Sequence, residues 1–287
     1  MLIIQSIVNI SEVNFYIMSS IIKLRGKGVS RIINSKVMLS PLAGVTDKIF
    51  RKLVRKWAPE SLLFTEMINA TSLKHGYGTQ KIKQLELEKG PIGVQIFDNR
   101  PFAVSEAAKL AEDSGAFLID INMGCPVKKI SRKGGGSALI NDRLLAIELV
   151  KRVSNAVKVP VTVKTRLGWE NKEENIEEFL LSLQDAGAEM ITLHGRTRKE
   201  GFSGKADWEM IGKIKELLEI PVIANGDIKN PKDAFNCFKK TNADGLMIGR
   251  GILGSPWKIG EIDYAVKEIK GFKEPNIEEK LLLIIEH

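Results

Sequence analysis

The feature that most restricts the fold of this 287-residue chain is a strand-then-helix alternation that repeats along it. Short apolar runs that end at Gly, Pro or polar residues are typical of buried parallel strands, because a strand covered on both faces has no polar side to show. Eight such runs occur, at residues 35–40, 62–65, 92–96, 117–121, 160–164, 190–193, 221–224 and 245–248. Helix-period segments separate them, for example at residues 103–114, 144–156, 176–186 and 208–218.

Eight strands that alternate with helices predict an α/β fold of the TIM (β/α)8 barrel type. The alternative is an open doubly wound sheet, which usually has fewer strands and a glycine-rich dinucleotide turn after the first one. Residues 41–44, Pro-Leu-Ala-Gly, do not provide that turn. The predicted organisation is an N-terminal extension and lead-in at 1–34, a catalytic barrel at 35–262, and a separate C-terminal region at 263–287.

Charge and cysteine content limit the classes of partner and compartment. The chain carries 43 Lys and Arg against 35 Asp and Glu, a net charge of +8. This excess suits a polyanionic partner such as nucleic acid, but it is equally compatible with a lysine-rich solvated surface. Cys125 and Cys237 are the only cysteines, so no disulfide framework exists and a reducing, cytoplasmic location is expected.

The sequence contains no membrane-spanning run, since none approaches the roughly 18 apolar residues that crossing a bilayer requires. Residues 1–17 are apolar in patches, but they lack a basic leading region and include Glu12. A signal peptide is therefore not expected, and we assign these residues no function.

Polar residues stand at the carboxyl ends of nearly all the predicted strands. In a (β/α)8 barrel this rim is where active sites are built, because the loops that follow the strands converge there. The residues are Gln95, Asn122, Cys125, Lys164, Arg166, His194, Arg196, Asn225, Asp227 and Arg250. The sequence therefore predicts an active site at the mouth of the barrel.

Cys125 follows the fourth strand in the sequence Asn-Met-Gly-Cys-Pro. The proline stiffens the turn that presents the thiol, and the glycines at 134–136 indicate a mobile or tightly curved loop nearby. The residues leave three roles open for Cys125: nucleophile, general acid, or inert thiol. An unperturbed pKa of about 8.5 leaves it mostly protonated at neutral pH, which suits proton donation. Cys237 lies in a helix-like segment and is expected to be a small core residue.

The loops after the seventh and eighth strands, Asn225-Gly226-Asp227 and Gly249-Arg250-Gly251, offer bare backbone N–H groups and a cation. Loops at these positions commonly bind phosphate in barrels, although they could also be plain tight turns. Lys164 is open to three roles: a structural cation, a Schiff-base amine, or a charge that faces an electron-rich cofactor. His194 is either a core histidine or ligand-facing. No metal site is expected, because no histidine has ligand spacing to another His or Cys.

From residue 38 to residue 257 the chain resembles the FMN-dependent tRNA-dihydrouridine synthases. The resemblance rests on motifs that occur in order at the predicted strand ends: Ser-Pro-Leu-Ala-Gly-Val-Thr-Asp at 40–47, Val-Gln-Ile at 94–96, Asp-Ile-Asn-Met-Gly-Cys-Pro-Val at 120–127, Lys-Gly-Gly-Gly-Ser-Ala-Leu at 133–139, Val-Lys-Thr-Arg-Leu-Gly-Trp at 163–169, Leu-His-Gly-Arg-Thr-Arg at 193–198, Ala-Asn-Gly-Asp-Ile at 224–228 and Met-Ile-Gly-Arg-Gly at 247–251. The first motif departs mildly from the family's usual Ala-Pro-Met.

The resemblance implies an enzyme that reduces the C5–C6 double bond of chosen uridines in tRNA, using FMN recharged by NADPH. It implies that Cys125 is the general acid and that Asn122 contacts the uracil edge. The cofactor-binding residues it implies are Pro41, Leu42 and Ala43 along the flavin, Gln95 and Lys164 at the isoalloxazine edge, and His194, Asn225, Gly226, Asp227, Gly249 and Arg250 at the ribityl phosphate. The residues it implies for RNA phosphate are Arg132, Lys133, Arg166, Arg196 and Arg198.

The family usually carries a helical C-terminal domain that grips tRNA, and residues 263–287 resemble the first helix of that domain. Leu281, Leu282 and Ile285 are expected to form an apolar face there.

Three other functions compete with the synthase: a free-pyrimidine oxidoreductase of the dihydroorotate dehydrogenase kind, a Schiff-base lyase that uses Lys164, and a non-catalytic RNA-binding protein. The tRNA uridine, the oligomeric state and the choice between NADPH and NADH are left open by the sequence.

Overall fold

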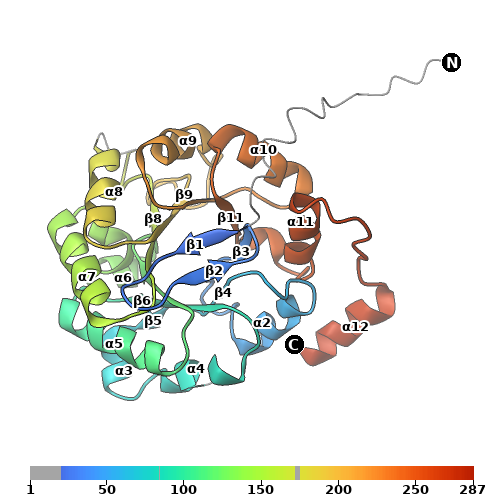
Figure 1. Ribbon diagram of the computed structural model, residues 1–287, viewed down its shortest axis with the longest axis horizontal. Helices are drawn as coiled ribbons and strands as arrows, with labels where there is room; N and C mark the ends of the chain where they lie inside the picture. The colour runs from blue at the N-terminus through green and yellow to red at the C-terminus, as the bar shows by residue number, and fades with distance from the viewer. Residues whose placement is uncertain (1–20, 84, 172–174) are drawn as a thin grey trace.

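A parallel barrel forms the body of the molecule in the computed structural model, which describes residues 21–83, 85–171 and 175–287. Residues 1–17, to which no function was assigned, lie outside this part of the chain. Figure 1 looks down the barrel, whose strands are β3 (Val37–Leu39), β4 (Leu63–Phe64), β6 (Ile92–Phe97), β7 (Leu118–Asn122), β8 (Val161–Arg166), β9 (Met190–His194), β10 (Val222–Asn225) and β11 (Gly245–Ile248).

The strand order confirms the predicted (β/α)8 barrel. Neighbours pair in the order β3-β11-β10-β9-β8-β7-β6-β4. The amide of Leu39 donates to the carbonyl of Leu62 at 3.1 Å, which joins the first strand to the second and closes the ring. An open sheet would leave these two edges apart. Each predicted strand is present, and one short strand that was not predicted, β5 (Ile68–Asn69), pairs with β6.

Helices cover the outside of the barrel: α2 (Lys48–Arg55), α5 (Pro101–Asp113), α7 (Arg143–Ala156), α8 (Ile176–Asp185), α9 (Trp208–Leu217), α10 (Pro231–Thr241) and α11 (Lys258–Val266). Shorter helical turns are α3 (Ala70–Lys74), α4 (Thr79–Lys83) and α6 (Lys128–Ser131). Side-chain caps fix several helix starts, because a carboxylate or amide oxygen satisfies an otherwise unpaired N–H of the first turn. Asp47, Asp142, Asp207 and Asn230 cap α2, α7, α9 and α10 in this way.

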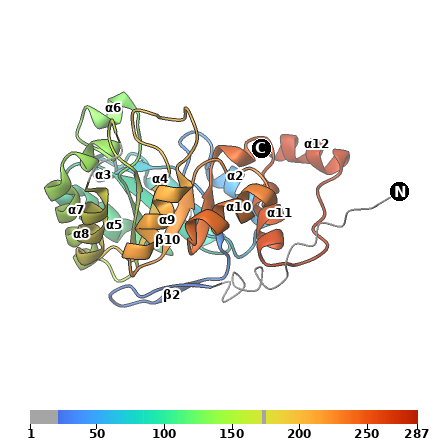
Figure 2. The same ribbon diagram turned by 90° about the horizontal axis from the view of Figure 1, so that it is seen from above.

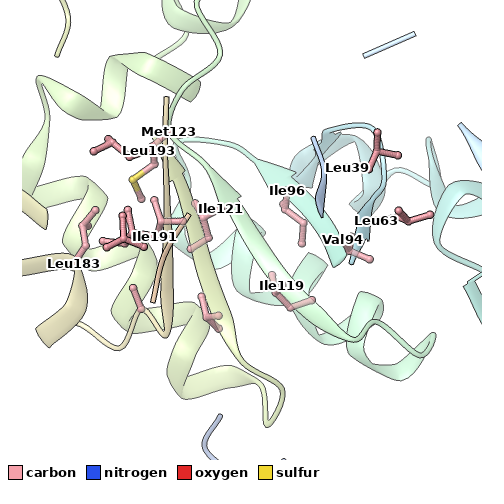
Figure 3. Packing of buried hydrophobic residues seen from close by; sticks show 14 of the residues in the cluster. Leu39, Leu63, Val94, Ile96, Ile119, Ile121, Met123, Leu183, Ile191 and Leu193 are labelled. Carbon is pink, nitrogen blue, oxygen red and sulfur yellow. The ribbon is translucent and has the colours of Figure 1, made fainter. Parts of the chain in front are cut away.

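The main hydrophobic core lies between the strands and these helices. Alternate strand residues point outward into it, among them Ile119 and Ile121 of β7 and Ile191 of β9 (Figure 3). Leu183 of α8 is one of the helix residues that pack against them. The intervening residues of the same strands therefore face the inside of the barrel.

A small antiparallel hairpin closes the amino end of the barrel. It consists of β1 (Ile22–Leu24) and β2 (Arg31–Ile33), which lie across the opening in Figure 1 and at the edge opposite α6 in Figure 2. The buried side chains on one face of the hairpin contact inward-pointing barrel residues: Met38, Leu62, Phe64, Leu118, Met190, Ile223 and Met247. The expected lead-in at 1–34 thus contains a part of the barrel body from residue 21 onward.

The C-terminal region follows helix α11. This helix continues to Val266, so the proposed boundary at residue 262 lies within it. Helix α12 (Ile277–Glu286) follows, and its Leu283 is buried against Leu53 of α2 and Trp257. The expected apolar face is present, because Leu281, Leu282 and Ile285 are all exposed.

The described part of the chain contains neither a membrane-spanning helix nor a cluster of metal ligands. None of the helices there is both long and apolar enough to cross a bilayer. In the same ranges, no three His, Cys, Asp or Glu side chains are grouped so that they could hold a metal ion.

Candidate active site

The strand register gathers the predicted polar residues at the carboxyl mouth of the barrel. Asn122 of β7 lies beside Lys164 of β8, and Arg166 of β8 lies beside His194 of β9. His194 in turn lies beside Asn225 of β10. Each of these residues is next to at least one apolar residue of the outer core, so all of them are on the inner side of adjacent strands.

A chain of side-chain hydrogen bonds fixes the loop that carries Cys125. The Gln95 Nε2 donates to Asp120 at 2.6 Å, and its Oε1 accepts from the Asn122 Nδ2 at 2.7 Å. The Asn122 Oδ1 accepts from the backbone amides of Gly124 at 3.2 Å and Cys125 at 2.9 Å. The barrel interior is thereby connected directly to the backbone of the proposed acid.

The Cys125 thiol is half-buried next to the glycine loop. Gly136 has φ of +60°, and a β-carbon there would lie 3.0 Å from the Cys125 carbonyl oxygen and 3.1 Å from its Cβ, so a side chain would be strained and would crowd Cys125. The amide of Ser137 also donates to the Cys125 carbonyl at 3.1 Å. Burial raises the pKa of Cys125 above its usual value, although the Val127 amide and nearby cations oppose this. The group is therefore a neutral thiol at neutral pH.

Lys164 is half-buried at the mouth and donates from Nζ to the Asn225 Oδ1 at 2.8 Å. The Asn225 Nδ2 donates to the Met247 carbonyl at 2.7 Å, which orients this amide. Burial and the nearby Arg166 lower the pKa of Lys164 to about 7. The lysine therefore stands close to the point where it changes protonation state at neutral pH.

A buried ion pair organises the other side of the mouth. The Arg196 guanidinium, 2% exposed, contacts the two carboxylate oxygens of Asp227 at 2.9 and 2.8 Å. It also donates to the carbonyls of Ser203 and Gly204, both at 2.7 Å. Partial burial acts to raise the pKa of Asp227, but the hydrogen bond from the Ala206 amide and the Arg196 charge outweigh it and lower that pKa. The pair fixes the loop that precedes α9.

Backbone and cation groups with the chemistry of a phosphate site lie nearby. Gly226 has φ of +120°, and a β-carbon there would come within 3.0 Å of the His194 ring, so a bare backbone is required. Arg250 is exposed, with its guanidinium 4.0 Å from the centre of the Phe202 ring, and it forms no ion pair with any described residue. Burial and the surrounding cations lower the pKa of His194 far below its usual range, so its ring is neutral.

Comparison with known proteins identifies the family. The model of the dihydrouridine synthase family matches residues 38–287. The chain is 50% identical over 258 residues to a probable tRNA-dihydrouridine synthase 1 of Synechocystis sp., an alignment that covers 90% of this chain and 73% of the relative. It is 38% identical over 259 residues to tRNA-dihydrouridine synthase B of Pasteurella multocida, covering 89% and 77%. The chain belongs to the dihydrouridine synthase family.

Membership makes the protein an oxidoreductase, and the resemblance found in the motifs is confirmed. A solved structure of morphinone reductase in complex with tetrahydroNAD shares the fold, with a TM-score of 0.58 over 91% of this chain and 94% of that one. At 12% identity this likeness shows the barrel alone.

Two of the arginines expected to face RNA phosphate are instead internal supports of this synthase. Arg166 is buried and donates to the carbonyls of Gly124, Thr197 and Gly201, at 2.7, 2.9 and 2.9 Å. Arg196 is occupied by Asp227 as described above. Neither guanidinium is open to solvent, because both cations sit on strand ends that the following loops cover. Lys133 is exposed, and Arg198 is half-buried with its guanidinium 4.4 Å from the centre of the Trp169 ring.

The first loop of the synthase, which contains Pro41, Leu42 and Ala43, is held by side chains that sequence reasoning did not single out. The Gly44 amide donates to Glu66 at 2.7 Å, and the Leu42 amide donates to the Thr46 hydroxyl at 3.0 Å. Pro41 and Leu42 are half-buried and Ala43 is exposed, so the backbone of this loop borders the mouth.

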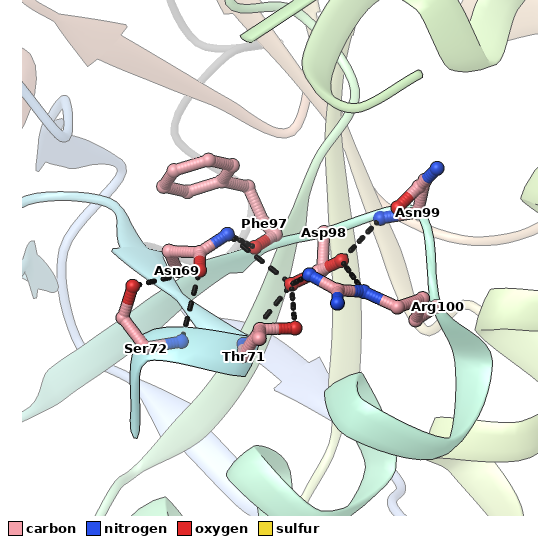
Figure 4. A network of polar contacts seen from close by, with 7 residues as sticks. All are labelled: Asn69, Thr71, Ser72, Phe97, Asp98, Asn99 and Arg100. Carbon is pink, nitrogen blue, oxygen red and sulfur yellow. Dashed lines mark hydrogen bonds and ion pairs between the residues drawn. The ribbon is translucent and has the colours of Figure 1, made fainter. Parts of the chain in front are cut away.

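Asp98 at the end of β6 was also missed (Figure 4). Its carboxylate accepts from the Thr71 hydroxyl at 2.7 Å, the Asn99 amide at 2.9 Å and the Arg100 Nε at 2.9 Å. These bonds join the turn after β6 to the start of α3, and Asn99 lies against Gly134 of the glycine loop. Its position directly after a predicted strand was the available signal.

Proposed function

We propose that this enzyme reduces the C5–C6 double bond of uridines in tRNA, with FMN as the cofactor and NADPH as the reductant. Family membership supplies the product, dihydrouridine, and the names of both relatives specify tRNA. The net charge of +8 suits a polyanionic substrate. The observation that carries the proposal is the anchored Cys125 thiol beside Lys164 at one end of a closed barrel.

The donor set at the mouth fits FMN. The bare backbone at Gly226 and Gly249, together with the free cation of Arg250, supplies the N–H groups and positive charge that a phosphate requires. Pro41 and Leu42 offer backbone and apolar surface to a flat ring. We assign Gln95 of β6 and Lys164 of β8 to the ring edge, where the second N–H of the Gln95 amide and the Lys164 amine are the available donors. Arg250 forms no ion pair with a described residue, although its charge contributes to the lowered pKa of Asp227.

The chain's own residues supply the proton and stabilise the charge. When bound and reduced by NADPH, FMN would supply the hydride for C6 of the uracil ring. Negative charge then develops on the C5 side and on the adjacent carbonyl, and the Cys125 thiol delivers a proton to C5. Because burial keeps Cys125 protonated, the proton is available at neutral pH. Lys164 would stabilise the negative charge, and the remaining N–H of Asn122 would donate to the uracil edge.

The RNA must present an unstacked base to this mouth, since the reacting carbon atoms are inaccessible within a stacked helix. Exposed cations lie on the turn that follows Cys125, where α6 begins. They are Lys128, Lys129, Arg132 and Lys133. We assign these residues to the phosphates that flank the extruded uridine, in place of the internal Arg166 and Arg196.

The test measures each half of the reaction separately. Protein reconstituted with FMN is reduced anaerobically with NADPH and then mixed with unmodified tRNA, and dihydrouridine is quantified. We expect flavin bleaching with NADPH, and product with wild type. Cys125→Ala should lower the rate of product formation by about 100-fold or more, the usual contribution of a general acid, while bleaching is unchanged. Cys237→Ala is the matched control, because that thiol is buried in α10 with its pKa raised to about 12 by burial.

Four outcomes would contradict the proposal. Failure to take up FMN would remove the cofactor, and a borohydride-trapped adduct on Lys164 would favour a lyase. Reduction of free pyrimidines as fast as tRNA would favour a small-molecule oxidoreductase. Full activity of Cys125→Ala would exclude this thiol as the acid.

A further inference from the structure

Asp120 is an acidic residue inside the barrel that the proposed reaction does not use. It lies on β7 between Leu118, which faces the apolar closed end, and Asn122, which faces the mouth. Its side chain is fully buried, and its carboxylate accepts from the Gln95 Nε2 and the Thr162 hydroxyl, both at 2.6 Å. A carboxylate in such a place is costly unless its hydrogen bonds compensate.

The hydrogen-bond partners allow only one orientation for each side-chain amide in this network. A carboxylate only accepts hydrogen bonds, so Gln95 must turn its NH2 group toward Asp120 and its oxygen toward Asn122. Asn122 must then give its NH2 group to Gln95 and its oxygen to the amides of Gly124 and Cys125. One carboxylate thereby selects between the two nearly isosteric orientations of two successive amides.

The charge state of Asp120 is compatible with this assignment. Burial raises the pKa of Asp120 to about 6, while the Gln95 and Thr162 hydrogen bonds and the Lys164 charge act in the opposite direction. The group is therefore mainly ionised at neutral pH, where it accepts at both oxygens.

We propose that Asp120 is a positioning residue that orients Gln95 and Asn122 and, through Asn122, holds the backbone of Cys125 in place for proton transfer. The catalytic part of this inference rests on the proposed function. The structural part does not, because the orientation of the loop is measurable without cofactor or RNA.

The first test is hydrogen exchange of the Gly124 and Cys125 amides in cofactor-free protein. Asp120→Leu removes the acceptor that orients Gln95, and we expect exchange at both amides to accelerate by about tenfold or more, as for loss of one buried hydrogen bond. Thr162→Val is the matched control, because it removes the other partner of Asp120 but leaves the acceptor for Gln95. Exchange at residues 124–125 should then stay within about threefold of wild type, and residues 245–248 of β11 serve as the internal reference for global opening.

A second variant covers the case in which Asp120→Leu does not fold. Gln95→Met interrupts the relay in the middle and should release the same two amides. Unchanged exchange in either folded variant would overturn the proposal, as would equal acceleration in Thr162→Val, which would indicate general loss of packing.

The activity readout separates this inference from the proposed function. In enzyme loaded with FMN and reduced by NADPH before tRNA is added, Asp120→Leu should slow the tRNA-dependent step by about tenfold or more. A wild-type enzyme that makes no dihydrouridine would reject the proposed function, and the exchange comparison would still decide whether Asp120 orients the loop. Normal turnover of tRNA by Asp120→Leu would overturn the catalytic part alone.

Discussion

The two ends of the barrel are built from the same strands, but one end is lined by apolar side chains and the other by polar ones. On β7 the inward side chains run from Leu118 at the closed end through Asp120 to Asn122 at the mouth. On β9 they run from Met190 to His194. The closed end is covered by the β1–β2 hairpin and is entirely apolar among its clustered residues, whereas the mouth concentrates amides, cations and a thiol.

This difference separates stability from function within one fold. Apolar side chains at the closed end gain free energy when they leave water, about 25 cal/mol per Å² buried. A positive charge at the mouth is costly, because burial lowers the pKa of Lys164 and keeps the His194 ring neutral. We therefore expect substitutions at the closed end to change stability with little effect on the site, and substitutions at the mouth to do the reverse.

The largest expected effect is at the hairpin. The Ile33 side chain is 0% exposed and packs against the closed end of the barrel. Ile33→Ala truncates it and should lower the free energy of unfolding by about 2–4 kcal/mol. Ile32→Ala on the next residue is the control, because that side chain is 53% exposed and should change stability by less than about 0.5 kcal/mol. Denaturant titration measures both, and FMN affinity should be unchanged in each. Loss of FMN binding by folded Ile33→Ala would show that the two ends are coupled.

The same contrast explains what the sequence was able to predict. Strands and their polar ends are local patterns, so the barrel and the residues at its mouth were predictable from runs such as 190–193 followed by His194. The hairpin was missed because each of its strands has only three residues. Its alternation of buried Ile22 and Leu24 around exposed Lys23 was the available signal.

Partners distant in the sequence were not predictable. A cation at a strand end has the same local pattern whether it faces solvent or a carboxylate 31 residues later, which is how Arg196 was assigned to RNA while it pairs with Asp227. The role of Asp120 could not be predicted from its motif, because its partners Gln95 and Thr162 come from two other strands. Gly136 was assigned to a mobile or tightly curved loop, whereas its contact with Cys125 explains the absence of a side chain.

A second prediction concerns the mouth, where function should change without stability. Arg250→Gln removes the exposed cation beside Gly249 and should raise the Kd for FMN by about tenfold or more, the usual value of a charged hydrogen bond. Binding of riboflavin, which lacks the phosphate, should change far less. Arg198→Gln is the control, because that guanidinium stacks on Trp169 and is not part of the proposed phosphate site. Equal loss of FMN and riboflavin affinity would place Arg250 at the ring and not at the phosphate.

The smallest expected effect is a pH dependence of stability that originates at Lys164. Its pKa is about 7 in the folded protein and 10.5 in the free side chain, so the unfolded chain binds more protons between these values. Below pH 7 Lys164 is charged in the folded protein, and the full cost of burying that charge lowers the free energy of unfolding. As pH rises from 7 toward 10.5 this cost disappears and the free energy of unfolding increases. Lys164→Met abolishes this gain. In cofactor-free protein, the difference in Tm between wild type and variant should shift in favour of wild type by a few degrees between pH 6.5 and 9.5, since about 1 kcal/mol moves Tm by about 2 °C in a chain of this length.

The comparison between variants is needed because other groups titrate in the same range. The pKa of Cys125 is raised by burial, so its contribution to stability falls as pH increases, opposite in sign to that of Lys164. Subtracting the Lys164→Met profile from the wild-type profile removes this shared term. The same substitution at Lys213, an exposed lysine of α9, should leave the wild-type profile intact. Parallel profiles for wild type and Lys164→Met would mean that neighbouring groups offset the cost of burying the Lys164 ammonium. The contrast between a stabilising closed end and a destabilising mouth would then not hold at this residue.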